Sequence, residues 1–213
     1  MRAPLPLGEW GPLLSTELVS EPSHTDLLLL FQRAQAQFTD RVDAVGPGEW
    51  EAIALPGWSV ADLVAHLTSE QLWAPPLLAG ESLDAVGQRI PTDTDELVGT
   101  DPLTAWETAA DGALAAWADP DVLDRTVQLS SGPTAAVDYL VEMTADLTVH
   151  AWDLARAIGG VTALDEDLVA AASRYAEEHL GDDGRPGLIA PPVPVPPGAD
   201  LQTRLLARFG RRA

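Results

Sequence analysis

The chain of 213 residues is 46% hydrophobic and 21% charged, which suits one globular domain, or at most two small ones, and excludes a disordered protein. Its formal net charge is −21, and basic residues cluster only at Arg211 and Arg212, which argues against binding to nucleic acid or to an anionic membrane. The sequence contains neither Lys nor Cys, which excludes a Schiff-base lysine, a P-loop, disulfides and a cysteine nucleophile, so any thiol chemistry needs an external thiol.

The first 22 residues contain Pro, Gly and Trp without any periodicity, and we expect them to form an irregular N-terminal extension. Residues 23–213 are expected to form a single domain. The N-terminus lacks the charged and apolar halves of a signal peptide, and no hydrophobic run reaches the roughly 18 residues of a membrane span. These features predict a cytoplasmic protein.

Five segments combine a helical period with start or stop signals: residues 24–45, 60–73, 101–117, 133–158 and 165–180. Each of the first two segments begins with a capping box, Ser23 with Asp26 and Ser59 with Asp62. The Pro-Pro pair that follows the second segment is expected to end that helix. The fourth segment is the longest, and Gly159 closes it.

The remaining segments carry weaker signals. Residues 80–99 are expected to be loop or short helix, and residues 122–130 an extended link. The proline-rich residues 186–200 cannot be helical, whereas residues 201–210 predict one more short helix. With no confident strand, the sequence predicts an all-α helical bundle.

Asp146 and His150 lie one helical turn apart, at the edge of an apolar stripe. Burying both groups is unfavourable unless they are paired or bound to a metal. On the second helix, His66 lies at a similar edge. Two imidazoles and a carboxylate suit a divalent metal with an open position for water or substrate. The alternative is a histidine that is satisfied by its neighbouring aspartate without a metal.

Three further residues could belong to the same site. Glu70, one turn from His66, is a fourth ligand, a general base or an exposed carboxylate. Trp73 shares the face of His66 and could wall a pocket. Asp153 either orients an imidazole from outside the ligand set or is a surface aspartate. By contrast, His24 and His179 fall at helix ends, where solvent and the helix dipole satisfy them.

The segments LPGWSVADLVAHL and DLTVHAWDLARAIG together resemble the DinB-like superfamily of metal-binding helical bundles. They are most similar to its actinobacterial branch, which includes mycothiol-dependent maleylpyruvate isomerase. EQLWAPPLLAG and PVPPGADLQTRLLARFGR extend the resemblance from about residue 25 to the end. It implies a DinB/YfiT-like four-helix bundle core with an additional C-terminal helix and a proline-rich tail. It also implies that His66, Asp146 and His150 are the metal ligands.

The resemblance favours a metal-dependent enzyme that activates mycothiol for transfer or isomerisation. Zinc or nickel is the expected metal, because two histidines and one carboxylate favour such cations over magnesium. Two alternatives stay open: a module that binds metal or a small molecule without catalysis, and a metal-assisted hydrolase that uses Glu70. Two departures argue against the isomerase activity itself. Asp146 stands where the isomerase has Glu, and the residues after the last long helix are too few for its additional C-terminal domain.

Overall fold

The computed structural model describes residues 22–185 and 188–213 of the chain. The N-terminal extension expected over residues 1–22 therefore lies, apart from its last residue, outside the described part. The described residues contain eight α-helices: α1 (His24–Asp43), α2 (Val60–Leu78), α3 (Leu83–Gly87), α4 (Thr94–Val98), α5 (Pro102–Trp117), α6 (Ala136–Ala157), α7 (Glu166–His179) and α8 (Leu201–Arg208). The protein is mostly helical, as predicted, and α8 lies where a last short helix was expected.

Two short hairpins and one 3₁₀ turn, Val122–Asp124, connect the helices. In the first hairpin, β1 (Ile53–Leu55) pairs with β2 (Trp58–Ser59), and in the second, β3 (Thr126–Leu129) pairs with β4 (Gly132–Ala135). The link expected over residues 122–130 is extended in part, because it contains β3, whereas the expectation that no strand forms was wrong. The reason is length: a strand of four residues or fewer is too short for an alternating pattern to stand out from its surroundings.

The start of α6 and the end of α2 also differ from the predictions. Helix α6 begins three residues later than expected, because Pro133 belongs to the second strand of its hairpin. Helix α2 continues through Pro75 and Pro76 to Leu78. Both Leu77 and Leu78 are buried, and α2 packs along α5, so tertiary packing outweighs the local preference of proline to end a helix.

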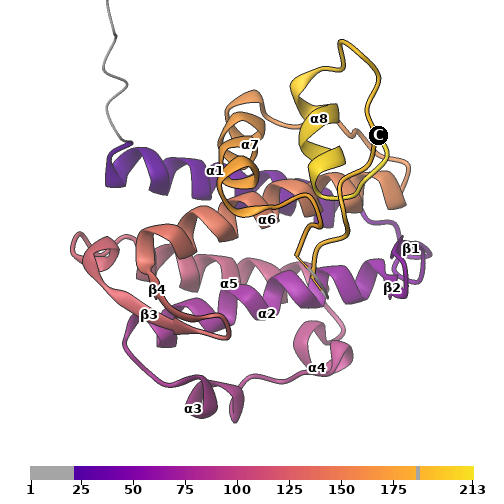
Figure 1. Cartoon of the computed structure of the whole chain (residues 1–213). Coiled ribbons are helices and arrows are strands. Elements are labelled where there is room, and N and C mark those ends of the chain that lie inside the picture. Colours follow the sequence, from indigo (N-terminus) through magenta and orange to yellow (C-terminus); the bar gives the residue numbers. More distant parts are fainter. Residues whose placement is uncertain (1–21, 186–187) are drawn as a thin grey trace, which may run out of the picture.

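The four longest helices pack against one another around the core (Figure 1). Helix α1 contacts α5 and α6, and α2 contacts the same two helices. Large side chains fill the space between them; Phe38 and Trp106, for example, meet edge to face with their ring centroids 4.7 Å apart. Helix α7 lies on α6, and α8 lies on α7. None of the described helices combines the length and the apolar character needed to cross a bilayer.

The capping box that begins α2 fixes the helix that carries His66. The Ser59 backbone N–H donates to Asp62 Oδ2 at 2.9 Å, and the Asp62 N–H donates back to Ser59 Oγ at 3.1 Å. Hydrogen bonds from Thr94 and Ser59 lower the pKa of Asp62. The predicted start of α2 is therefore confirmed in its side-chain detail.

Replacing Ser59 by Ala should reduce the free energy of unfolding by about 1 kcal/mol, because it leaves an N-terminal amide of α2 without its partner. Urea denaturation would measure the loss. Ser69→Ala, the same substitution inside the same helix, is the matched control and should change stability by less than about 0.5 kcal/mol. Equal stability of the two variants would show that the cap does not hold α2.

Candidate metal centre

The structure brings together the three residues that the sequence selected as metal ligands. His66 projects from α2, whereas Asp146 and His150 project from consecutive turns of α6. His66 Nε2 lies 3.7 Å from Asp146 Oδ2, and His150 Nε2 lies 3.4 Å from Asp146 Oδ1. One ligand atom of each residue lies within 4.8 Å of the others.

These separations fit a small cation. Bonds of roughly 2.0–2.2 Å to zinc in a tetrahedral site place neighbouring ligand atoms about 3.3 Å apart. Both imidazoles turn Nε2 toward the shared carboxylate, with the two rings edge to face and their centroids 5.6 Å apart. The donor set and its geometry therefore fit a divalent metal ion.

Asp146 and His150 strongly influence each other's ionisation. Burial opposes a charge on the His150 imidazole, but the carboxylates of Asp146 and Asp153 outweigh that effect and raise its pKa to about 9. Burial likewise opposes the charge of Asp146, yet His150 and His66 lower its pKa well below the ordinary value. In the absence of a metal, the site therefore holds a proton that a metal would have to displace.

Asp153 is not a surface residue, so that alternative was wrong. Its side chain is 0% exposed, and its Oδ2 lies 2.9 Å from His150 Nδ1. In a neutral His150 ring, the Nδ1–H group can donate a hydrogen bond to Asp153. The lone pair of Nε2 then points toward His66 and Asp146. The carboxylate thus orients the imidazole, which is the first of the two roles predicted for Asp153.

His66, Asp146 and His150 line an open cavity of about 1340 Å³. Trp73 lines this cavity, in the place that its helical spacing predicted. Glu70 also lines it and is partly buried, so the alternative of an exposed carboxylate is wrong. Burial, together with the negative charges of Asp146 and Glu142, raises the pKa of Glu70 despite the nearby histidines.

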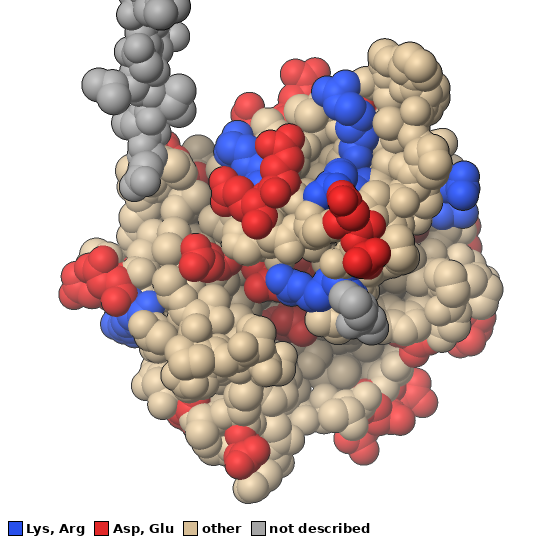
Figure 2. Space-filling view, viewed as in Figure 1, with Lys and Arg blue, Asp and Glu red and all other residues tan. Residues whose placement is uncertain are grey.

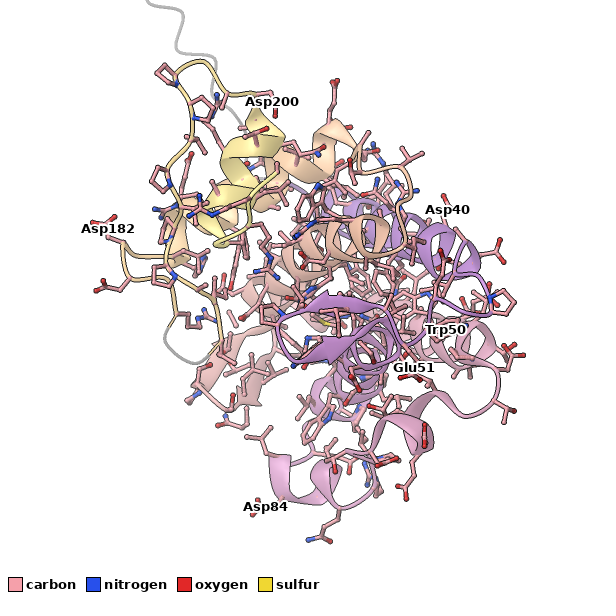
Figure 3. All side chains as sticks on the ribbon, turned by 90° about the vertical axis from the view of Figure 1, so that its right-hand side faces the viewer. Asp40, Trp50, Glu51, Asp84, Asp182 and Asp200 are labelled. Atoms are coloured by element: carbon pink, nitrogen blue, oxygen red, sulfur yellow. The ribbon has the colours of Figure 1, made fainter. Side chains whose placement is uncertain are left out.

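Other residues at the cavity were missed in the sequence. Trp58 follows the turn of the first hairpin and meets the His66 ring edge to face, with 5.0 Å between centroids. In Figure 3, this hairpin lies in front of the helices, near the labelled Trp50. Arg185 donates to Glu142 Oε1 at 2.6 Å and also lines the cavity. No periodic pattern marks Trp58 or Arg185 in the sequence, because both lie next to turns and neither lies on the face of a long helix.

The C-terminal segment supplies another part of the cavity wall. Arg211 lines the cavity and binds Asp153, 58 residues earlier in the chain. In the sequence, only the basic pair at the tail drew attention to it. On the face shown in Figure 2, basic side chains gather over α8 while acidic ones are scattered. The C-terminal part thus brings basic groups to an otherwise acidic protein.

The two remaining histidines lie outside the candidate site, as predicted. His24 Nε2 is 2.9 Å from the carbonyl oxygen of Trp117. His179 stacks on Tyr175, with 4.6 Å between ring centroids, and its Nδ1 lies 3.1 Å from the carbonyl oxygen of the same residue. Backbone carbonyl groups therefore account for both imidazoles, that of Trp117 being 93 residues from His24 along the chain.

Comparison with known proteins identifies the family. The profile described as "Mycothiol maleylpyruvate isomerase N-terminal domain" matches residues 31–155, which include His66, Asp146 and His150. The chain belongs to this family. The match ends within α6, so α7, α8 and Arg211 lie beyond the part of the chain that the family profile describes.

Relatives and solved structures agree with this family assignment. Two uncharacterised proteins of Mycobacterium tuberculosis, from strains CDC 1551 / Oshkosh and H37Rv, are each 30% identical over 200 residues, covering 87% of this chain and 100% of theirs. Crystal structures of mycothiol-dependent maleylpyruvate isomerase and of a histidine-to-alanine mutant of it align with TM-scores of 0.56 and 0.57. Both share 17% identity and cover 73% of this chain and 70% of their own, which shows a shared fold.

Proposed function

We propose that the protein binds one divalent metal through His66, Asp146 and His150 and uses it to activate a low-molecular-weight thiol for transfer or isomerisation. The observation that carries the proposal is the convergence of two imidazole Nε2 atoms and a carboxylate at the wall of an open cavity. When bound, a divalent cation lowers the pKa of a coordinated thiol. Zinc or nickel suits the donor set, and the family makes mycothiol the thiol to test first.

The chain's own residues can supply the other requirements of such a reaction. Three protein ligands leave a coordination position for a thiol, and all three line the cavity. Glu70 lies on the same wall, and its raised pKa makes it a stronger base than an ordinary glutamate, able to accept the proton that the thiol releases. Asp153 keeps the His150 ring in the orientation that ligation needs.

The size of the cavity favours a reaction with two partners. Its volume of about 1340 Å³ exceeds the roughly 300–1,000 Å³ typical of sites for a single small molecule. A thiol and a second small substrate can therefore occupy it together. Trp58 and Trp73 provide apolar walls on either side of the helix turn that bears His66.

We also propose a single domain of the DinB/YfiT type over residues 23–213, in the cytoplasm. The C-terminal segment is joined to α6 by the ion pair of Arg211 with Asp153, and α8 packs on α7, which supports one domain. The maleylpyruvate isomerase activity itself is not proposed, because the family match is limited to that enzyme's N-terminal domain. A hydrolase using the three ligands and Glu70, and a non-catalytic binding module, are the competing functions.

Cobalt substitution distinguishes these functions. Titrating the cobalt-loaded protein with a low-molecular-weight thiol should produce a sulfur-to-metal charge-transfer band, with the thiol ionising well below the roughly 8.5 of a free thiol. The band should be absent in His66→Ala, which breaks the ligand set, and present in Glu70→Gln, which removes only the proposed base. No new absorption at millimolar thiol, with cobalt occupancy confirmed, would reject thiol activation in favour of hydrolysis or simple binding.

A further inference from the structure

Asp153 joins the candidate metal centre to the C-terminal end of the chain. One of its carboxylate oxygens lies 2.9 Å from His150 Nδ1 and accepts a hydrogen bond of 2.7 Å from Arg211 Nη2. Arg211 Nε donates to the other oxygen at 3.2 Å, so the guanidinium binds the carboxylate with two nitrogens. The Asp153 side chain is 0% exposed and that of Arg211 15%, so solvent does little to screen this pair.

The end of α8 aims Arg211 at this carboxylate. The Arg211 N–H donates to the carbonyl oxygen of Leu206 at 2.8 Å, and the Gly210 N–H donates to that of Ala207 at 3.0 Å. This is the hydrogen-bond pattern of a Schellman motif, with Gly210 at a φ of 79°. A Cβ on Gly210 would lie 2.7 Å from the Cβ of Ala190, so both the backbone conformation and the space require glycine.

We propose that Arg211 is a positioning residue for the metal centre, acting through Asp153 to hold the His150 ring in its ligating orientation. The inference rests on the proposed metal site. A buried carboxylate without a cationic partner is strongly unfavourable, so loss of Arg211 would let Asp153 rotate away, and His150 Nδ1 would lose its fixed acceptor. With a metal on Nε2 the imidazole is neutral, which leaves Arg211 as the cation that balances Asp153.

The same chain of contacts couples metal binding to docking of the C-terminal segment. If Arg211 strengthens metal binding, then metal must strengthen the attachment of Arg211 and of the α8 end by the same factor. The arginine lies beyond residues 31–155, so it adds a support for the site from outside the family-matched region. Metal affinity thereby depends on a residue 61 positions after His150 in the chain.

Chelator competition with zinc on the full chain tests the proposal. Arg211→Met should weaken zinc binding about 10- to 100-fold, the usual effect of losing a group that supports a metal ligand. Arg204→Met, which removes an exposed arginine of α8, is the matched control and should change affinity by less than about twofold. The zinc affinity of Arg211→Lys should lie between those of Arg211→Met and Arg204→Met, because an ammonium keeps the charge but cannot make the two-nitrogen contact.

Two further readouts separate positioning from a general loss of structure. The ligand-field spectrum of the cobalt-saturated protein should change in Arg211→Met and not in Arg204→Met. In an Asp153→Asn background, Arg211→Met should add little to the loss of affinity, because both substitutions break the same contact. If Arg211→Met alone folds poorly, zinc affinity can still be compared between Asp153→Asn and the double variant, because neither contains a buried Asp153 carboxylate without a cation.

The outcomes are distinguishable. Absence of zinc binding in the unmodified protein would overturn the proposed metal site itself. Normal zinc binding by the unmodified protein, with equal affinities in Arg211→Met and Arg204→Met, would overturn the positioning role and leave the metal site standing. Hydrogen exchange adds a reciprocal check: amides of residues 205–211 should exchange more slowly when zinc is added, and unchanged exchange would contradict the coupling.

Discussion

Replacing His150 by Ala is expected to empty the metal centre. His150 is the most buried of the three proposed ligands, with its side chain 9% exposed, and both of its ring nitrogens lie near carboxylates. The two residues that remain, His66 and Asp146, cannot enclose a cation. The loss of affinity should therefore exceed the roughly 10- to 100-fold caused by removing a supporting group alone.

Elemental analysis after dialysis provides the measurement for His150→Ala. The unmodified protein should retain about one metal per chain, and the variant should retain almost none. His179→Ala is the matched control, because His179 is an exposed histidine that stacks on Tyr175, away from the candidate site. It should keep its metal. Full metal content in His150→Ala, with native circular dichroism, would remove His150 from the ligand set.

Local signals account for the parts of the fold that could be predicted. The capping boxes at Ser23 and Ser59 located the starts of α1 and α2, because a side chain that satisfies a helix end must lie within three residues of it. Pro102 occupies the first position of α5, one residue after the predicted start of that segment. The end of α2 was misplaced because burial of Leu77 and Leu78 against other helices decides it, and no local signal reports such contacts.

The residues of the candidate site also divide into those that the sequence could predict and those that it could not. His66, Asp146 and His150 could be selected because helical spacing sets which residues share a face, and the resemblance to DinB-like proteins joined the two helices. Trp58 and Arg211 could not be selected from the sequence. The position of Trp58 depends on a hairpin turn, and that of Arg211 depends on the docking of α8. Contacts between segments far apart in the sequence leave no periodic pattern in either one.

The affinity for metal is expected to rise about tenfold between pH 7 and pH 8, and more slowly as the pH approaches 9. In the metal-free protein, the carboxylates of Asp146 and Asp153 outweigh burial and raise the pKa of His150 to about 9. Below that pH the imidazole is protonated, so a metal must displace one proton to bind. An ordinary histidine, with a pKa near 6.5, would show almost no such dependence above pH 7.5.

The stability of the metal-free protein should change in the opposite direction over the same range. Because folding raises the pKa of His150, the stabilisation is fully present below about pH 6.5 and is lost as the pH rises through about 9. The unfolding midpoint in urea should therefore decrease from pH 6.5 to 9 without metal. Bound metal should reduce this decrease, because it takes the place of the proton on His150.

Calorimetric titration in two buffers of different ionisation enthalpy would count the protons released on metal binding. At pH 7.5 about one proton per metal is expected from the unmodified protein. Asp153→Asn removes one of the two carboxylates that raise the pKa of His150, so the release at this pH should decrease and the pH dependence of affinity should level off earlier. Proton release close to zero in the unmodified protein would show that His150 is neutral before the metal arrives, and would contradict the ion pair with Asp146 as the resting state of the site.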